Sequence, residues 1–147
     1  MTTNFELSNT LKNYKAFGGV FSKSDLPFMG ILDKFYIINL QDRDDGGGTH
    51  WVLLHNSNKY ECIYFDSFGQ PPPDVIVEFM KKSHNRKKLL YNDSQYQLLE
   101  SIKCGEFCVL VAILLERGFT YKEILDKILS KTDFSYNEEV VRGIVKK

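Results

Sequence analysis

Three residues of types that can act together in nucleophilic catalysis stand out in the chain: His50, Asp66 and Cys104. A cysteine thiolate attacks a carbonyl carbon, a histidine takes up the thiol proton and later returns it, and a carboxylate orients that histidine. This chemistry requires the three side chains to meet, although they are far apart in the sequence. The elements that carry them therefore decide whether the sequence supports a catalytic site.

Cys104 lies at the start of an almost uninterrupted apolar segment that ends near Arg117 and Gly118. The segment is too long for a buried strand and too short to span a bilayer, so it predicts a core helix. It is apolar on every side, which is typical of a helix buried in the middle of a domain. The unpaired N–H groups and the dipole at the start of such a helix favour an anion, and this indicates a thiolate at Cys104.

The histidine and the carboxylate lie at the ends of two segments, 50–56 and 60–66, whose β-branched and aromatic residues predict strands. Because the segments are so close in sequence, a β-hairpin centred on Asn58 is the simplest connection. In that register His50 lies directly opposite Asp66, with Cβ atoms about 4.5–5.5 Å apart on one face. A shift of one residue would place the two side chains on opposite faces.

The other patterns predict an α+β fold class, in which a small mixed sheet packs against the buried central helix within one domain, residues 1–147. The expected elements are a short helix within 4–16, a break at Phe17–Phe21, a strand at 35–40, an exposed loop at Gln41–Thr49, a helix from Pro73–Asp74, a strand at Lys88–Asn92, and helices that begin with the capping boxes Thr120–Glu123 and Ser135–Glu138.

Composition and charge exclude several classes of protein. Nineteen Lys and Arg residues balance nineteen Asp and Glu residues, so no global charge requires a nucleic-acid or membrane partner. No segment approaches the roughly 18 apolar residues of a membrane span, and the N-terminus lacks the features of a signal peptide. Three cysteines, an odd number, predict reduced thiols and a protein that is not secreted.

Each candidate residue also has an ordinary structural explanation. A cysteine before an apolar helix is often a small core residue, and a strand histidine or Asp66 could serve only local packing or a turn. The joint arrangement favours catalysis more than any one residue does. An oxyanion would need the backbone N–H of Cys104 and a side-chain amide, for which the residues leave Gln95 and Gln97 as alternatives.

Three motifs follow one another along the chain: Gly-Gly-Thr-His-Trp at 47–51, Phe-Asp-Ser-Phe-Gly at 65–69, and Gln-x6-Cys-Gly-x-Phe-Cys at 97–108. In this order they resemble motifs of adenain, the adenovirus maturation protease, and of its relatives in virophages, polinton-type elements and large DNA viruses. A weaker similarity extends upstream to 17–27. The same superfamily contains the SUMO-specific proteases.

This resemblance implies a papain-related cysteine protease architecture of the adenain type. It implies that His50, Asp66 and Cys104 form a catalytic triad and that Gln97 supplies the side chain of the oxyanion hole. Gln95 would then have a structural or substrate-side role. The chain departs from the adenoviral pattern at Asp66, where those enzymes have glutamate and the SUMO-specific proteases have aspartate.

The resemblance also implies a substrate cleft and an activity. Trp51, Gly48 and Gly105 would line the cleft. The enzyme would be a monomeric cysteine endopeptidase that cleaves viral capsid or core precursors near glycine during virion maturation, in the virion and the infected host cell. The alternatives are a deubiquitinase- or SUMO-protease-like isopeptidase acting on host conjugates, and a non-catalytic protease-like module that binds capsid protein or DNA.

The sequence itself requires no cofactor and shows no common metal-site spacing. The family resemblance implies that DNA or a viral peptide could activate the enzyme. The region of Arg86, however, lacks the cysteine through which the adenoviral enzymes bind their peptide. A basic run could contact DNA phosphates, and a solvated charged face is the alternative. The residues of that run are Lys81, Lys82, Arg86, Lys87 and Lys88.

The remaining cysteines and histidines receive no chemical role from the sequence. Cys108 lies one helical turn after Cys104 within the apolar segment, and Cys62 alternates with apolar residues in a strand, so both are predicted to be core residues. His84 lies in the basic run and His55 lies at a strand end.

Overall fold

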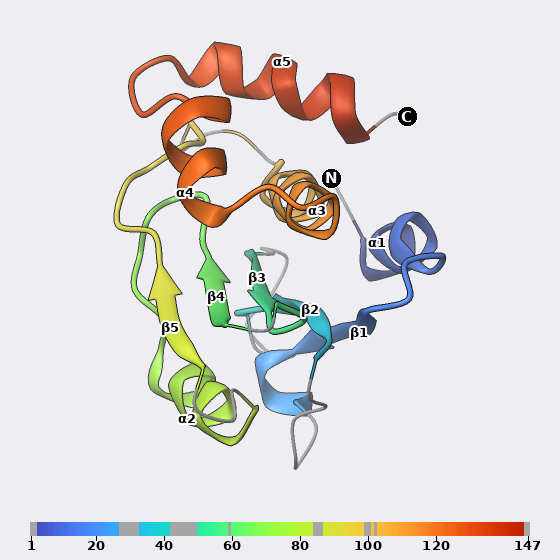
Figure 1. The fold of residues 1–147 in the computed structure, drawn as a ribbon. Coiled ribbons are helices and arrows are strands. Elements are labelled where there is room, and N and C mark those ends of the chain that lie inside the picture. Colours follow the sequence, from blue (N-terminus) through green and yellow to red (C-terminus); the bar gives the residue numbers. More distant parts are fainter. Residues whose placement is uncertain are drawn as a thin grey trace.

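A mixed five-stranded sheet forms the middle layer of the molecule, with helices on both of its faces (Figure 1). The computed structural model describes residues 3–26, 33–41, 50–58, 60–83, 87–98, 101 and 103–145. The elements are α1 (Asn4–Leu11), β1 (Phe17–Ser22), the short helix η1 (Lys23–Asp25), β2 (Phe35–Asn39), β3 (Trp51–His55), β4 (Glu61–Phe65), α2 (Asp74–Ser83), β5 (Lys88–Tyr91), α3 (Cys104–Glu116), α4 (Tyr121–Glu123), the π-helical turn η2 (Ile124–Ile128) and α5 (Phe134–Val145).

The strands lie in sequence order, β1-β2-β3-β4-β5. Strand β3 runs antiparallel to both of its neighbours, β2 and β4, while β1 runs parallel to β2 and β5 runs parallel to β4. The mixed sheet packed with helices therefore agrees with the predicted fold class. The predicted loop at Gln41–Thr49 lies outside the described residues except for Gln41.

The β3–β4 pairing differs from the predicted register. In the predicted register His55 faces Glu61, whereas in the structure it faces Ile63, a shift of two residues. The connection is longer than expected, since β3 ends at His55 and β4 begins at Glu61. A shift of two keeps every side chain on the same face, so His50 and Asp66 become diagonal rather than directly opposed neighbours.

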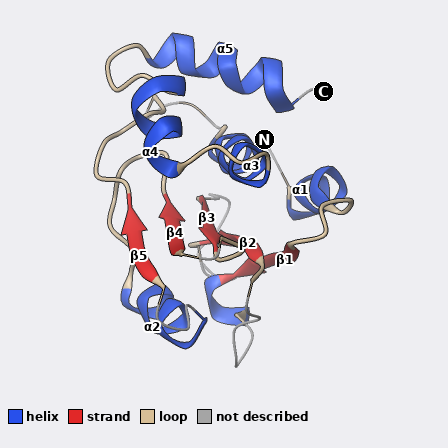
Figure 2. Ribbon diagram, in the orientation of Figure 1, coloured by secondary structure: helices blue, strands red, loops and turns tan. Residues whose placement is uncertain are grey.

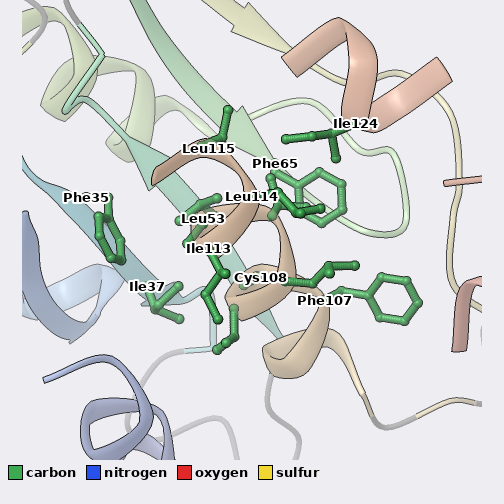
Figure 3. Close-up of a cluster of buried hydrophobic side chains, with 14 of the residues drawn as sticks. Phe35, Ile37, Leu53, Phe65, Phe107, Cys108, Ile113, Leu114, Leu115 and Ile124 are labelled. Atoms are coloured by element: carbon green, nitrogen blue, oxygen red, sulfur yellow. The ribbon is translucent and has the colours of Figure 1, made fainter. Parts of the chain in front are cut away.

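The two faces of the sheet have separate apolar cores. Helix α3 packs on β3 and β2 and also contacts α1 and α5, whereas α2 covers the other face (Figure 2). Alternate strand residues supply the two cores, because successive side chains of a strand point to opposite faces. Figure 3 shows the larger core, in which α3 meets Phe35, Ile37, Leu53 and Phe65.

Helix α3 is the predicted central helix, and eleven of its residues are buried. It ends where the sequence indicated: Gly118 has φ +97°, and the N–H groups of Gly118 and Phe119 donate to the carbonyls of Leu115 and Leu114. A glycine in this conformation is a common helix terminator. No helix in the described ranges is long and apolar enough to cross a membrane.

One local prediction is incomplete and another is wrong. The N-terminal helix ends before Phe17–Phe21, as expected, but this segment is the edge strand β1, whose register is interrupted between Phe17 and Gly19, where Gly19 takes φ +127°. The second capping box is wrong, because α5 begins at Phe134 and Asp133 Oδ1 accepts the N–H of Tyr136 at 3.0 Å. The first capping box, Thr120 with Glu123, is confirmed.

Candidate active site

The N-terminus of α3 meets the beginning of β3, and this contact places the candidate nucleophile. The N–H of Trp51 donates to Cys104 Sγ at 3.4 Å, and one helical turn later Cys108 Sγ donates to the Trp51 carbonyl at 3.4 Å. The residue before α3, Lys103, makes no side-chain capping hydrogen bond to the helix. A sulfur at a helix N-terminus that also accepts a backbone N–H is well placed to carry negative charge.

His50 precedes β3 and lies between Cys104 and Asp66. Its Nε2 is 3.1 Å from Asp66 Oδ2, and its ring stacks on Phe68 with a centroid separation of 5.2 Å. The backbone of His50 is held by Asn39, whose Oδ1 accepts the His50 N–H at 3.4 Å. Because Nε2 contacts the carboxylate, Nδ1 is the ring nitrogen left to exchange a proton with a thiol. The structure thus brings together the three residues that the sequence singled out.

Several influences act on the charge of His50. Burial favours the neutral ring, but the contacts with Asp66 and the hydrogen bond to Cys104, together with the charges of both groups, outweigh it and raise the pKa of His50 to about 9. Near neutral pH the ring is therefore an imidazolium. Such a ring beside a cysteine at a helix N-terminus favours a thiolate–imidazolium pair.

Asp66 is fully buried and lies just beyond the end of β4. Its Oδ1 accepts the N–H of Phe68 at 2.8 Å, which leaves Oδ2 for His50. The turn that follows needs glycine at Gly69, where φ is +77° and a Cβ atom would lie 2.7 Å from the Ser94 carbonyl carbon. The Phe-Asp-Ser-Phe-Gly motif therefore fixes both the carboxylate and the ring that stacks on the histidine.

Gln97 is buried and its amide is held on both sides. Ser67 Oγ donates to Gln97 Oε1, and Gln97 Nε2 donates to the Ser101 carbonyl at 2.9 Å. The orientation of the amide follows from this, because a carbonyl can only accept a hydrogen bond. Gln95 Nε2 donates to the Gln97 carbonyl at 2.7 Å, so Gln95 has a structural contact. The contact of Gln97 with the site is its hydrogen bond with Ser67, the residue that follows Asp66 in the sequence. Its oxyanion role stays a prediction.

The three predicted cleft residues lie in different settings. Trp51 is 4% exposed and its side chain belongs to the core beneath α3, so little of the ring faces solvent. Gly105 is buried in the first turn of α3, and Gly48 lies outside the described residues. The cleft role of these residues stays a prediction.

A surface pocket lies beside the segment that leads into the nucleophile. Its walls come from that segment and from α5, and two of its lining residues form an ion pair, with 3.5 Å between Lys103 Nζ and Glu138 Oε2. The lining residues are Leu98, Ser101, Lys103, Ser135, Glu138, Glu139 and Arg142. This pocket lies next to the candidate site, and it was not expected from the sequence.

The other two cysteines are core residues, as predicted. Cys62 and Cys108 are fully buried, and all three cysteines are free thiols. Burial raises the pKa of the Cys62 thiol to about 12 and raises that of Cys108 well above its ordinary value. Both therefore remain neutral thiols near pH 7. Within the described residues no group of three or more His, Cys, Asp or Glu side chains could hold a metal ion.

Among the described residues of the basic run, Lys87 does not share an exposed surface with the other lysines. The ammonium of Lys87 is buried against the rest of the molecule, where it pairs with Asp33 at 3.0 Å and donates to the Asn56 carbonyl. Lys87 is therefore poorly placed to contact DNA. Lys81 and Lys88 are exposed, as is Lys82, while Arg86 and His84 lie outside the described residues. A DNA contact through the exposed lysines stays a prediction.

A second histidine–carboxylate pair, at the other end of β3, was missed by the sequence reasoning. His55 Nε2 is 2.7 Å from Glu116 Oε2 and 2.9 Å from Ser57 Oγ, and Ser57 Oγ donates to the same carboxylate oxygen at 2.6 Å. Phe35 stacks on the ring with a centroid separation of 5.7 Å. The sequence signal is slight, because Glu116 ends the apolar helix far from the strand.

Comparison with known proteins supports the fold. Two crystal structures of the ASFV pS273R protease, one of them with selenomethionine, are similar to this chain with TM-scores of 0.66 and 0.67 at 16% and 15% sequence identity. Each match covers 99% of this chain and 66% of that protein, so the chain spans 66% of the length of that protease. No protein-family model and no curated protein matches the sequence. At this identity the likeness concerns the fold, which fits the papain-like architecture of a viral cysteine protease but does not single out the adenain type.

Proposed function

We propose that the chain is a cysteine endopeptidase of the adenain type. The observation that carries this proposal is the meeting of Cys104, His50 and Asp66 at the start of α3, with 3.1 Å between the histidine and the carboxylate. The similarity of the fold to that of the ASFV pS273R protease supports it. The three sequence motifs that resemble adenain supply the finer assignment.

In the first half of the reaction Cys104 is the nucleophile. In the thiolate–imidazolium pair the thiol proton already lies on His50, so the sulfur forms a bond to the scissile carbonyl carbon, whose oxygen becomes an oxyanion. We assign the stabilisation of that oxygen to the backbone N–H of Cys104 and to the second amide N–H of Gln97. His50 then donates its proton to the leaving amine, the C–N bond breaks, and an acyl-enzyme remains.

In the second half a water molecule replaces the amine. His50 takes a proton from the water, the hydroxide attacks the thioester carbonyl, and the C–S bond breaks to release the acid and the thiolate. Asp66 keeps the imidazole oriented in both halves and stabilises its cationic form. The ring of Phe68, which stacks on the imidazole, limits its rotation about the Cβ–Cγ bond of His50.

The proposed substrates are viral capsid or core precursor proteins, cleaved near glycine. Purified protein should hydrolyse peptides with glycine near the scissile bond and should be labelled at Cys104 by a thiol-directed active-site probe. The Cys104→Ala variant should do neither. Ubiquitin-like fluorogenic substrates form the second arm, since preferential cleavage of these would favour an isopeptidase acting on host conjugates.

An intact, folded protein that cleaves neither class of substrate and is not labelled at Cys104 would contradict the proposal. That result would favour a non-catalytic module that binds capsid protein or DNA. Adding DNA to each assay tests activation by a polyanion, and a rate increase that disappears at high salt is expected if phosphates contact the exposed lysines.

A further inference from the structure

Asp66 is held through its backbone as well as through its carboxylate, and both side-chain contacts to that backbone come from one residue. The N–H of Asp66 donates to Asn92 Oδ1 at 3.0 Å, and Asn92 Nδ2 donates to the Asp66 carbonyl at 2.6 Å. Asn92 is 3% exposed and Asp66 is fully buried. The Asn92 amide therefore pairs with Asp66 as a neighbouring strand would.

This pairing begins where the β4–β5 ladder ends. The last paired residues are Tyr64 and Tyr91, and Asp66 and Asn92 both lie beyond them. Backbone past the end of a ladder has no regular partner, so its position depends on whatever side chains bind it. The side chain of Asn92 extends the pairing to the residue that contacts His50.

Asn92 is itself fixed by other groups. Its Nδ2 also donates to the Ser94 carbonyl at 3.1 Å. The hydroxyl of Tyr121, at the start of α4, lies 3.2 Å from Asn92 Oδ1 and 2.9 Å from the Tyr64 carbonyl, and its one proton serves both. Tyr121 is 4% exposed. A fixed amide in a buried setting can hold its partner within a narrow range of positions.

We propose that Asn92, fixed by Tyr121, is a positioning residue that holds the Asp66 backbone so that the carboxylate lies against His50. The inference rests on the proposed function, because it assigns a role in the same site. Asn92 touches neither His50 nor Cys104 in the contacts described above and acts through Asp66. A small displacement of an orienting group is enough to lower the rate of a positioned reaction.

The competing explanation is that Asn92 only satisfies buried polar groups at the strand ends. A matched residue separates the two explanations. Asn137 is also a buried asparagine: its Oδ1 accepts the N–H of Ser130, and its Nδ2 donates to the carbonyls of Tyr96 and Ser130, at 2.7–2.8 Å. Loss of either amide should destabilise the fold, but only loss of Asn92 should change the surroundings of His50.

The test measures the pKa of His50 by NMR titration of its imidazole in the full chain. This readout does not depend on peptide cleavage, so failure of the proposed function and failure of this inference give different results. Asn92→Ala is expected to lower the pKa of His50 by about 1 or more and to lower kcat about 10-fold with little change in KM. Tyr121→Phe, which removes only a hydroxyl, should give smaller changes of the same sign. Asn137→Ala should lower the thermal midpoint without moving the pKa of His50.

An unchanged pKa of His50 in folded Asn92→Ala, or an equal shift in Asn137→Ala, would overturn the inference. If Asn92→Ala does not fold, Tyr121→Phe decides the matter. A lowered pKa of His50 in that variant supports the role of the Asn92 amide, and an unchanged pKa overturns it.

Discussion

The two ends of strand β3 carry similar groups in different arrangements. Before its first residue, His50 meets Asp66, Cys104 and the ring of Phe68; at its last residue, His55 meets Glu116, Ser57 and the ring of Phe35. Each end thus has a histidine, a carboxylate, a potential nucleophile and a stacked phenylalanine. The groups present at the two ends are alike, so their geometry must explain any difference in function.

The contacts of the ring nitrogens distinguish the two ends. At the first end the carboxylate takes Nε2 and the other side of the ring remains for the sulfur. At the second end, Glu116 Oε2 and Ser57 Oγ both contact Nε2 of His55, and the Ser57 hydroxyl donates a hydrogen bond to the Glu116 carboxylate. Within the described residues, Nδ1 of His55 is buried without a hydrogen-bond partner. The second cluster therefore links α3 to β3 and cannot relay a proton from the serine.

The largest expected difference concerns the two nucleophiles. Cys104→Ala should lower kcat by roughly 10⁴-fold or more, since the residual rate would come from binding groups alone. Ser57→Ala is the matched change at the other end and should leave kcat nearly unchanged. Peptide hydrolysis and thermal unfolding of both variants provide the measurements. Comparable cleavage by Cys104→Ala and wild type would remove the basis for the assignment.

The carboxylates provide the second contrast. Asp66→Asn should lower kcat by about 10²- to 10⁴-fold, because an amide cannot stabilise the imidazolium. Glu116→Gln should instead reduce the free energy of unfolding by about 1–3 kcal/mol, as expected for a disrupted buried hydrogen-bond cluster, and should retain cleavage. Kinetics and denaturant titration on each variant test this. Equal losses of activity and stability in Asp66→Asn would make that residue structural.

The pH dependence of the free energy of unfolding should have opposite signs for the histidine–carboxylate pairs at the two ends of β3. Since the pKa of His50 is raised, its pairing contributes fully below pH 6.5, and that contribution is lost as the pH rises through about 9. At the other end, the hydrogen bond to His55 lowers the pKa of Glu116; burial opposes this shift and the hydrogen bond to Ser57 adds to it. The stabilisation from the Glu116 pairing is therefore present above pH 4.5 and is lost as the pH falls through the lowered pKa.

Denaturant titrations across this pH range measure both effects. His50→Gln should flatten the alkaline decline in the free energy of unfolding, and Glu116→Gln should flatten the acid decline. If His50→Gln altered only the acid limb, the raised pKa would be wrong.

The stacked rings give the smallest expected effect. Phe68→Leu should lower kcat by about 2- to 10-fold, in line with the ~0.5–1.5 kcal/mol of an aromatic pair. Phe35→Leu, in the core beside His55, should lower the thermal midpoint and leave kcat close to that of wild type. Steady-state kinetics and thermal unfolding separate these outcomes, and a larger kcat loss in Phe35→Leu would contradict the comparison.

Sequence patterns predicted most of the strongly periodic elements and the meeting of the three site residues. Composition and length indicated α3 because a long apolar run has few alternative structures. The predicted β3–β4 register differed from the observed one by two residues. Because a shift by an even number of residues keeps side chains on the same face, the prediction still placed His50 and Asp66 on one face. The geometry of the turn decides the register, and that geometry could not be inferred from the local sequence.

The missed features depend on contacts between distant segments. Strand β1 contains two glycines, which disfavour an isolated strand, and it forms because β2 provides a parallel edge. The pairing of His55 with Glu116 joins residues whose spacing carries no local pattern. The contact of Asn92 with Asp66 was missed for the same reason, since Asn92 was predicted only as the last residue of a strand and its partner lies in a distant segment.

One helical turn of α3 meets a single residue of β3, because Cys104 and Cys108 contact the N–H and the carbonyl of Trp51. These partners are main-chain atoms, so substituting Trp51 by any residue other than proline leaves both of them in place. The separation of nucleophile and base is then a property of chain spacing, and it can persist while the surrounding side chains diverge. Transplanting this site into another scaffold would require the strand-to-helix spacing to be copied, whereas residue 51 itself could be varied.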